Sequence, residues 1–215
     1  MGSDAKPHFH PRGWKRFCRL RKDGHSVAAL GFNCEAASIN RFSSRYRLAR
    51  AFKSVELDFY APKTAEGYSA LFRLFLTWSA FEQFLVVISR EQKDLDSLML
   101  EYDATALLSA VRKADTNDAF CDFLNSKVNK SHQQRLADYR NGKLHNPTYF
   151  ASAVRHIFAH GHLGAYADDA RPAQIKRVSH LLCDFLMRVM DGEFSRHVRV
   201  AISRVSSAST TSRLS

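Results

Sequence analysis

Cysteine, proline and glycine are scarce in this chain. Its 215 residues include 4 Cys, 5 Pro and 9 Gly, and no two cysteines form a CxxC pair. Widely separated cysteines argue against a disulfide framework and against a structural zinc site, and they favour free thiols in a reducing compartment. We therefore expect a cytoplasmic protein. The cysteines are Cys18, Cys34, Cys121 and Cys183.

Long apolar runs are also missing. The nearest candidate for a membrane helix, residues 71–88, contains Arg73, Glu82 and Gln83, whereas a membrane span needs about 20 predominantly apolar residues. Residues 1–22 are basic and have no apolar core of the kind found in secretory signals. The sequence therefore predicts neither a membrane partner nor a secretory signal.

Several patterns of known enzyme classes are absent as well. The chain has no alternating strand pattern of useful length, no internal repeat, no glycine-rich phosphate loop and no HExxH motif. These absences argue against the common nucleotide-binding folds and against a zinc protease. We expect no cofactor and no metal.

Acidic residues are too few to balance the basic ones. The chain holds 32 Lys and Arg against 21 Asp and Glu, a formal net charge of +11, and seven of the basic residues lie within residues 1–25. A basic segment beside a basic domain favours a polyanionic partner, either nucleic acid or an anionic surface, although excess charge also serves solubility alone. We predict that residues 1–35 form a flexible basic arm or irregular lead-in.

Residues 36–204 read as one all-α domain, a bundle of five or six helices. Apolar residues recur at helical spacing, and the stretch 71–88 is apolar nearly all round, which predicts a buried central helix. Polar residues 129–134 interrupt the pattern, and residues 205–215 are rich in Ser and Thr, which predicts a disordered tail. The expected helices are 36 to about 61, 65–90, 104–113, one that carries Phe120 to Val128 after a cap at Asp115, Thr116 or Asn117, 148–160 after a cap at Asn146, and 172 to about 189 or beyond, where Gly192 is a candidate kink or end.

Basic and titratable side chains gather where the helix 148–160 ends. His156 and His160 are four residues apart and share a helix face, whereas Arg155 lies about 140° away from His160 around an ideal helix. Arg155 and His160 converge on one target if the helix ends at His160, with Gly161 as the C′ glycine, or if two copies of the helix meet across a dimer.

Four interpretations of this cluster compete. It could cleave a phosphodiester, with histidines as proton carriers and Arg155 stabilising the charge, or bind an anion without chemistry. It could hold a metal, but no nearby glutamate completes an HExxH motif and Arg155 would repel a cation. It could simply cap the last carbonyls of the helix, which the spacing by itself favours.

A resemblance favours the first interpretation. An arginine, a polar residue and a histidine a few positions later, near the end of a late helix in an all-α domain, resemble the signature of the HEPN superfamily. Arg155, His156 and His160 match that signature residue by residue, with His156 where asparagine is commoner. The segment 76–85 resembles the aromatic-rich second helix of such domains, which often carries an acidic residue, here Glu82. The resemblance covers roughly residues 38–190.

The resemblance implies a metal-independent endoribonuclease in which the 2′-OH of RNA attacks the adjacent phosphate and leaves a 2′,3′-cyclic phosphate. His160 would be the general base or acid, Arg155 would hold the phosphate, His156 would orient the site or carry the second proton, and Glu82 would hold Arg155 or a histidine. It further implies RNA as substrate, a homodimer with a composite site, and a role as a toxin, in antiviral defence or in RNA processing, with an antitoxin or other protein partner.

The alternative is a non-catalytic helical module that binds RNA or another protein. His145 and His162 are expected to lie outside the chemistry, and Cys121 and Cys183 to belong to the core.

Overall fold

The computed structural model describes the backbone of residues 9–211 and the side chains of residues 9–203. Over this part of the chain there are nine α-helices and no named β-strand, with one isolated bridge between Ala167 and Ala170. The all-α prediction is confirmed, but the predicted number of helices is too low. The helices are α1 (Trp14–Lys22), α2 (Ala36–Ala51), α3 (Pro62–Ile88), α4 (Asp96–Glu101), α5 (Ala104–Ala114), α6 (Ala119–Lys127), α7 (Lys130–Arg140), α8 (Thr148–Ala159) and α9 (Pro172–Thr211), with 3-10 turns at η1 (Gln92–Asp94) and η2 (Thr116–Asp118).

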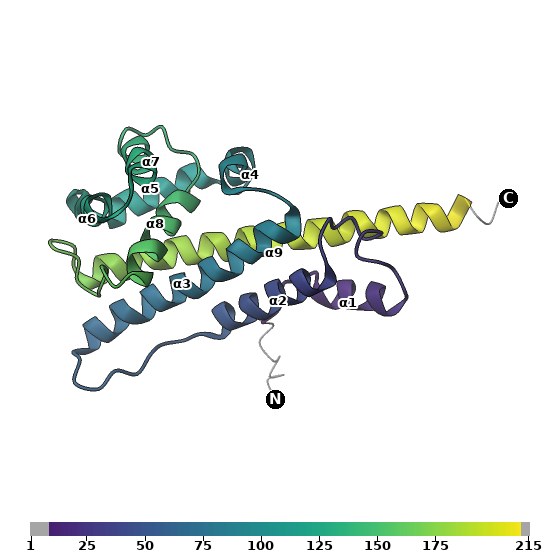
Figure 1. Cartoon of the computed structure of the whole chain (residues 1–215), viewed down its shortest axis with the longest axis horizontal. Coiled ribbons are helices and arrows are strands. Elements are labelled where there is room, and N and C mark those ends of the chain that lie inside the picture. The colour runs from purple at the N-terminus through teal and green to yellow at the C-terminus, as the bar shows by residue number, and fades with distance from the viewer. Residues whose placement is uncertain (1–8, 212–215) are drawn as a thin grey trace, which may run out of the picture.

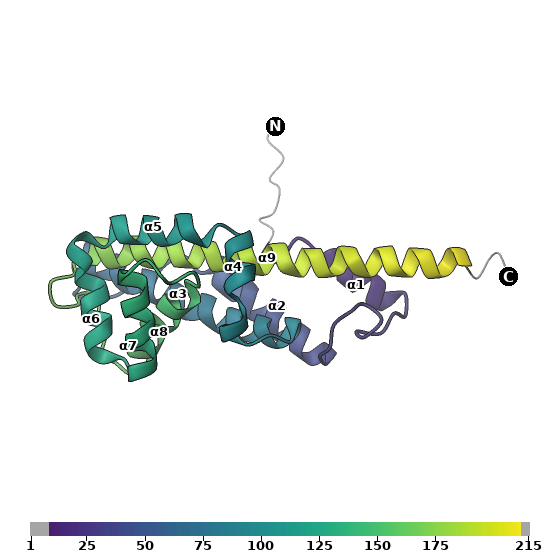
Figure 2. The ribbon, with the colours of Figure 1, turned by 90° about the horizontal axis from the view of Figure 1, so that it is seen from above.

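Helix α9 is the axis of the molecule. It is 40 residues long, which corresponds to about 60 Å at 1.5 Å per residue. Figure 1 shows α5 to α8 gathered on one side of its N-terminal half, with α2 and α1 on the opposite side. The view from above shows the C-terminal end of α9 extending past the other helices (Figure 2).

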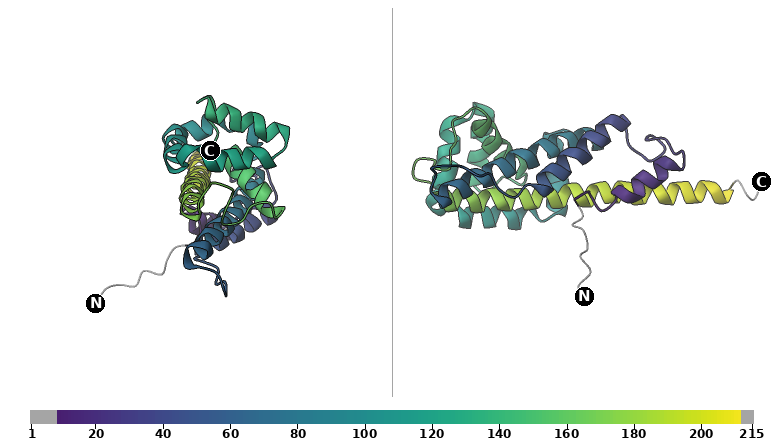
Figure 3. Two further views of the ribbon diagram at one scale, coloured as in Figure 1. Left: turned by 90° about the vertical axis from the view of Figure 1, so that its left-hand side faces the viewer. Right: turned by 90° about the horizontal axis from the view of Figure 1, so that it is seen from below.

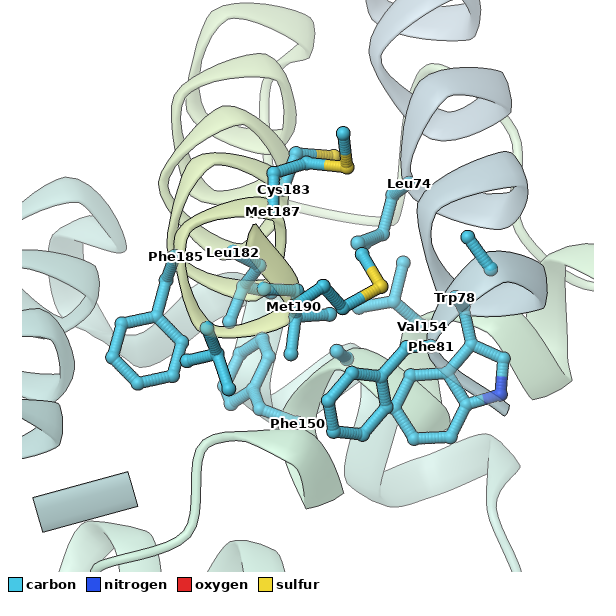
Figure 4. Packing of buried hydrophobic residues seen from close by; sticks show 14 of the residues in the cluster. Leu74, Trp78, Phe81, Phe150, Val154, Leu182, Cys183, Phe185, Met187 and Met190 are labelled. Carbon is cyan, nitrogen blue, oxygen red and sulfur yellow. The ribbon is translucent and has the colours of Figure 1, made fainter. Parts of the chain in front are cut away.

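Helix α3 is the central element of the core. It packs against α2, α8 and α9, and residues on most of its circumference are buried, including Leu74, Trp78 and Phe81. These side chains meet Phe150 of α8 and residues of α9 (Figure 4). A helix that is apolar nearly all round is stable in water only when neighbours cover it, so the prediction of a buried central helix is confirmed.

The N-terminal segment differs from the predicted arm. Phe17 and Phe32 are almost fully buried and lie 5.9 Å and 5.7 Å from Phe194 of α9 between ring centroids. Arg12 forms an ion pair with Asp191 at 2.6 Å. The right-hand view of Figure 3 shows α1 against the C-terminal half of α9. Residues 9–35 therefore belong to the folded domain, and residues 1–8 lie outside the described residues.

Three further boundaries differ from the prediction. Helix α2 ends at Ala51 and not near residue 61, and an extended residue, Phe52, follows it. The polar residues 129–134, expected to interrupt the helices, start α7: the Asn129 side chain caps it by accepting a hydrogen bond from His132 N at 3.1 Å, as asparagine commonly does. Only Leu136 and Tyr139 of α7 are buried, so its sequence has no apolar periodicity. Helix α9 runs to Thr211, which makes residues 205–211 of the predicted disordered tail helical, while residues 212–215 lie outside the described residues.

Two features bear on the predicted compartment. By length and composition α3 is apolar enough to cross a membrane, but half of its most apolar stretch is buried inside the fold, as in the core helix of a soluble protein. All four cysteines are free thiols. The fold is compatible with a soluble protein, and the cytoplasmic location stays a prediction.

Gly192 does not end or break α9; it makes room for Tyr102. A Cβ at position 192 would lie 2.8 Å from Tyr102 Cε1 and closer still to its hydroxyl. That hydroxyl donates to Glu193 Oε1 at 2.8 Å, and Glu193 is almost fully buried. The Tyr102 ring cannot retreat without breaking this hydrogen bond, so the position requires glycine despite the helical cost of that residue.

We predict that Gly192→Ala lowers the free energy of unfolding by about 2 kcal/mol, because overpacking against Tyr102 outweighs the roughly 1 kcal/mol that alanine gains in a helix. Urea denaturation of the two proteins measures the difference. In a Tyr102→Ala background, where the ring is gone, the same substitution should instead stabilise the protein. A stabilising effect of Gly192→Ala in the wild type would contradict this account.

Candidate functional site

The end of α8 sets the backbone of the site. Gly161 adopts the left-handed conformation with φ +73°, which glycine adopts without strain. The N–H of His162 donates to Ile157 O at 2.9 Å, and the N–H of Gly161 donates to Phe158 O at 3.1 Å. These two bonds define a Schellman end. The predicted stop at Gly161 is confirmed, and His160 is the first residue past the helix.

The start of α8 is fixed by a buried asparagine. Asn146 Oδ1 accepts the backbone N–H of Thr148 at 3.1 Å, and its amide donates to Gln92 O at 2.9 Å and to Asp96 Oδ1 at 3.2 Å. Asn146 and Thr148 are both fully buried. The predicted N-cap, Asn146, lies one residue too early, because the structure has Pro147 at the N-cap and begins the helix at Thr148. Asn146 instead ties the helix that carries the cluster to the η1–α4 segment.

Arg155 lies beside Glu82. Arg155 Nη2 is 3.6 Å from Glu82 Oε1, and the two side chains are 35% and 43% exposed. Arg155 comes from α8 and Glu82 from α3, which pack together. An ion pair this exposed contributes little to stability, but it restricts where the guanidinium lies. The structure thus brings together two of the four residues singled out in the sequence.

His156 and His160 also lie together. Their ring centroids are 4.5 Å apart and their planes are inclined by 64°, so the side chains that share a face by spacing share it in the structure. His156 is partly exposed and His160 is exposed. The pair stands at the open end of α8, where a substrate can reach both rings.

A third imidazole, His132 of α7, completes the row and was missed from the sequence. Its ring centroid lies 6.0 Å from that of His156, with the planes inclined by only 16°. Its Nε2 is 3.0 Å from Ser152 Oγ and its Nδ1 is 3.1 Å from Asn129 Oδ1. In a neutral ring protonated at Nδ1, Nδ1 donates to Asn129 Oδ1, and Nε2 competes with Tyr149 O, 3.0 Å from Ser152 Oγ, for the single hydroxyl proton of Ser152. No local pattern in the polar segment 129–134 marks this residue.

The surroundings favour the neutral forms of two of these imidazoles. The pKa of His156 is lowered by partial burial and then by the positive charges of His160, Arg155 and His162. The pKa of His132 is lowered by burial and then by His156. His162, which the sequence placed outside the chemistry, thus acts on His156 through its charge. A neutral imidazole at neutral pH can accept a proton, as a general base must.

The same shifts carry a consequence for stability. A histidine whose pKa is lowered in the folded protein binds a proton more readily in the unfolded chain than in the folded one. The contribution of His132 to stability is therefore complete above the ordinary histidine pKa and is lost as the pH falls through the lowered one.

The site is an open strip on the protein surface. A cavity of about 610 Å³ lies elsewhere, beside α6 and the segment before α9, and its lining includes Asn117, Asp122 and Arg171 but none of the clustered histidines. Small-molecule sites are usually concave and enclose most of the ligand. An exposed strip of imidazoles and one guanidinium instead suits a polymer that passes across it.

The described residues offer no preformed metal centre. Over residues 9–203, no group of three or more His, Cys, Asp and Glu side chains is placed to hold a metal ion. His132 stacks on His156, and His160 meets His156 edge to face. The charge of Arg155 acts on His156, and that cation disfavours a second positive charge.

Comparison of the chain with family models, with curated proteins and with solved structures finds no match. The likeness to the HEPN superfamily therefore depends on the residues of the cluster and on the all-α fold alone.

We predict that His160→Gln raises the pKa of His156 toward the ordinary histidine value, because it removes one of the charges that lower it. Arg155→Gln should do the same. Titration of the imidazole C–H signals by NMR measures the pKa directly. His145→Gln, a substitution at an exposed loop residue, is the control and should leave the pKa of His156 unchanged. If the pKa of His156 stays the same or falls in both cluster variants, the electrostatic account is wrong.

Proposed function

We propose that this protein is a metal-independent, HEPN-like endoribonuclease that cleaves RNA by attack of the 2′-OH on the adjacent phosphate. The observation that carries the proposal is Arg155, placed by Glu82 at 3.6 Å, on the same helix end as two imidazoles with ring centroids 4.5 Å apart. Phosphodiester transfer without a metal needs two proton carriers and a fixed cation. This strip supplies all three.

In the proposed mechanism His156 is the base. Its lowered pKa keeps it neutral at neutral pH, so it can take the proton of the 2′-OH. The O2′–P bond forms as the P–O5′ bond breaks, and His160 donates a proton to the departing O5′. The products are a 2′,3′-cyclic phosphate and a 5′-hydroxyl. Water then enters no step of the strand cleavage itself.

Arg155 stabilises the charge that develops on the non-bridging oxygens. A guanidinium presents its donors in a planar fork that matches two phosphate oxygens. Glu82 acts through Arg155 and is a positioning residue: without it, the flexible side chain of Arg155 has no fixed partner among the described residues. His132 supports His156 from the other side of α8.

The homodimer belongs to the same proposal. One copy leaves the strip open on its outer side, and a second copy would supply an opposing wall. Phe72, 39% exposed, meets Phe158 of α8 with ring centroids 5.1 Å apart, which leaves an apolar edge close to Arg155 of the kind that protein contacts cover. An antitoxin or other protein partner, and a role as a toxin, in defence or in RNA processing, stay predictions from the resemblance.

The alternative, a non-catalytic helical RNA-binding or protein-interaction module, is favoured by a separate observation. Exposed cations are concentrated on α1 and α2, whereas the imidazoles belong to α7, α8 and the end of α8. A binding module needs those cations but is indifferent to His160.

We predict that the wild-type protein cleaves a mixed RNA pool in EDTA and leaves fragments with 2′,3′-cyclic phosphate ends. His160→Ala should reduce the rate about 10²- to 10⁴-fold, the usual contribution of a proton carrier. His145→Ala is the control and should cleave like the wild type. Intact RNA in all tubes, with folded protein and a broad panel of RNAs, would favour the binding module.

Glu82→Gln should lower the cleavage rate about tenfold, because Arg155 loses the partner that orients it. Its melting temperature should scarcely change, since partly exposed ion pairs contribute little to stability. Adding Glu82→Gln to an Arg155→Gln protein should have almost no further effect on the rate. Glu91→Gln, which breaks an exposed pair with Lys93, is the matched control. Unchanged activity of Glu82→Gln would exclude the positioning role.

A further inference from the structure

Two helices carry positive charge without any acidic residue. Helix α1 holds five Lys and Arg, helix α2 holds four Arg, and neither contains Asp or Glu. All nine basic side chains are exposed. We call these nine residues the basic platform: they are Lys15, Arg16, Arg19, Arg21, Lys22, Arg41, Arg45, Arg47 and Arg50.

The charges of the basic platform are not compensated within the described chain. The ion pairs formed by residues 9–203 include none of the nine. Where platform residues make side-chain hydrogen bonds, the acceptors are neutral: Arg41 donates to Ser38 Oγ, Arg45 to Ser79 O and Arg21 to His25 O. An excess of unpaired positive charge attracts a polyanion.

The basic platform is fixed on folded helices and does not sit on a loose arm. Phe17 of α1 is buried against Phe194 of α9, and Phe42 of α2 is buried against Phe84 of α3 and Phe194. The cations therefore keep their spacing, which lowers the entropy lost when a ligand binds. Seven of the nine are arginines, the side chain whose fork matches phosphate oxygens.

The exposed side of the platform favours a nucleic acid over a membrane. A helix that binds a membrane surface inserts its apolar face among the lipids. The apolar residues of α1, Phe17 and Trp14, pack instead against Phe194 of α9, which leaves the cations outward.

We propose that the basic platform binds the sugar–phosphate backbone of single-stranded RNA. Arg45 Nη1 donates to Ser79 O at 3.3 Å, and Ser79 lies one turn of α3 before Glu82. A strand bound along α2 therefore leads toward Arg155 and the imidazole row. The inference that the strand leads toward the imidazole row depends on the proposed endoribonuclease function, whereas binding of the RNA backbone by the platform does not.

The test measures binding without cleavage. A fluorescent 2′-O-methyl oligouridine, which lacks the attacking hydroxyl, is titrated with each protein at several salt concentrations. The platform variant replaces four arginines of α2 by glutamine, and the control variant removes the same charge from exposed lysines at the other end of the molecule. The platform variant is R41Q/R45Q/R47Q/R50Q and the control is K113Q/K127Q/K130Q/K143Q.

We expect the platform variant to bind on the order of tenfold more weakly and to show a shallower salt dependence, since each lost contact to a single strand reduces the slope by about 0.7. The control should bind like the wild type. A second variant, R47Q/R50Q, removes two side chains that make no hydrogen bond within residues 9–203, so it should not disturb the fold. It should show a smaller loss of binding. Circular dichroism checks that both variants are folded.

Three outcomes would contradict RNA binding by the platform: no binding by the wild type, equal loss of binding in the platform and control variants, or binding of the wild type to phosphatidylserine vesicles but not to the oligonucleotide.

RNA binding by the platform and the proposed nuclease function can be refuted independently of each other. If the platform variant alone loses binding while no protein cleaves the unmodified RNA, the platform stands and the nuclease proposal is wrong.

Discussion

The need to cover α3 on every side determines the rest of the structure. This helix is apolar around nearly its whole circumference, and α2, α8 and α9 each take one side of it. Removing that surface from water is the main favourable term available to an all-α fold of this size. The packing of α8 against α3 also places Glu82 next to Arg155. The polar site is thus built on the edge of the contact between α3 and α8, where packing holds its backbone in place.

The site joins elements that are far apart in the sequence. Glu82 comes from α3, His132 from α7, and Arg155, His156 and His160 from α8 and its end. Asn146 and the Schellman end fix the two ends of α8, so the side chains between them keep their directions. Sites on rigid elements hold their geometry better than sites on loops. The flanking contacts from α3 and α7 then restrict Arg155 and His156 from opposite sides.

Apolar periodicity in the sequence predicted much of the fold, and the elements that were not predicted have no such periodicity. The helices that bury an apolar stripe, such as α3 and α9, were predicted. The polar residues expected near the starts of α6 and α8 include Asp115 and Asn146, which accept backbone N–H groups there, although the N-caps themselves are Asp118 and Pro147. Helix α7 buries only two residues and reads as polar sequence. Phe17 and Phe32 lie in a segment with no regular period, and only contacts with Phe194, more than 160 residues away, make them core. The pairing of His132 with His156 depends on such a distant contact, so no local pattern could predict it.

A bound phosphodiester would change the pKa of His156. Partial burial, and then the positive charges on His160, Arg155 and His162, lower the pKa of His156 in the free protein, which keeps the ring neutral and able to accept a proton. A bound phosphate places a negative charge beside the same groups and offsets them, so the pKa of His156 rises on binding. In the proposed mechanism the base thereby becomes stronger only when substrate is present, and it gains the proton of the 2′-OH as the negative charge moves onto the phosphoryl oxygens next to Arg155. The cations that lower the pKa of His156 in the free protein are also the ones that favour the transition state, because the attacking strand itself supplies the negative charge that balances them.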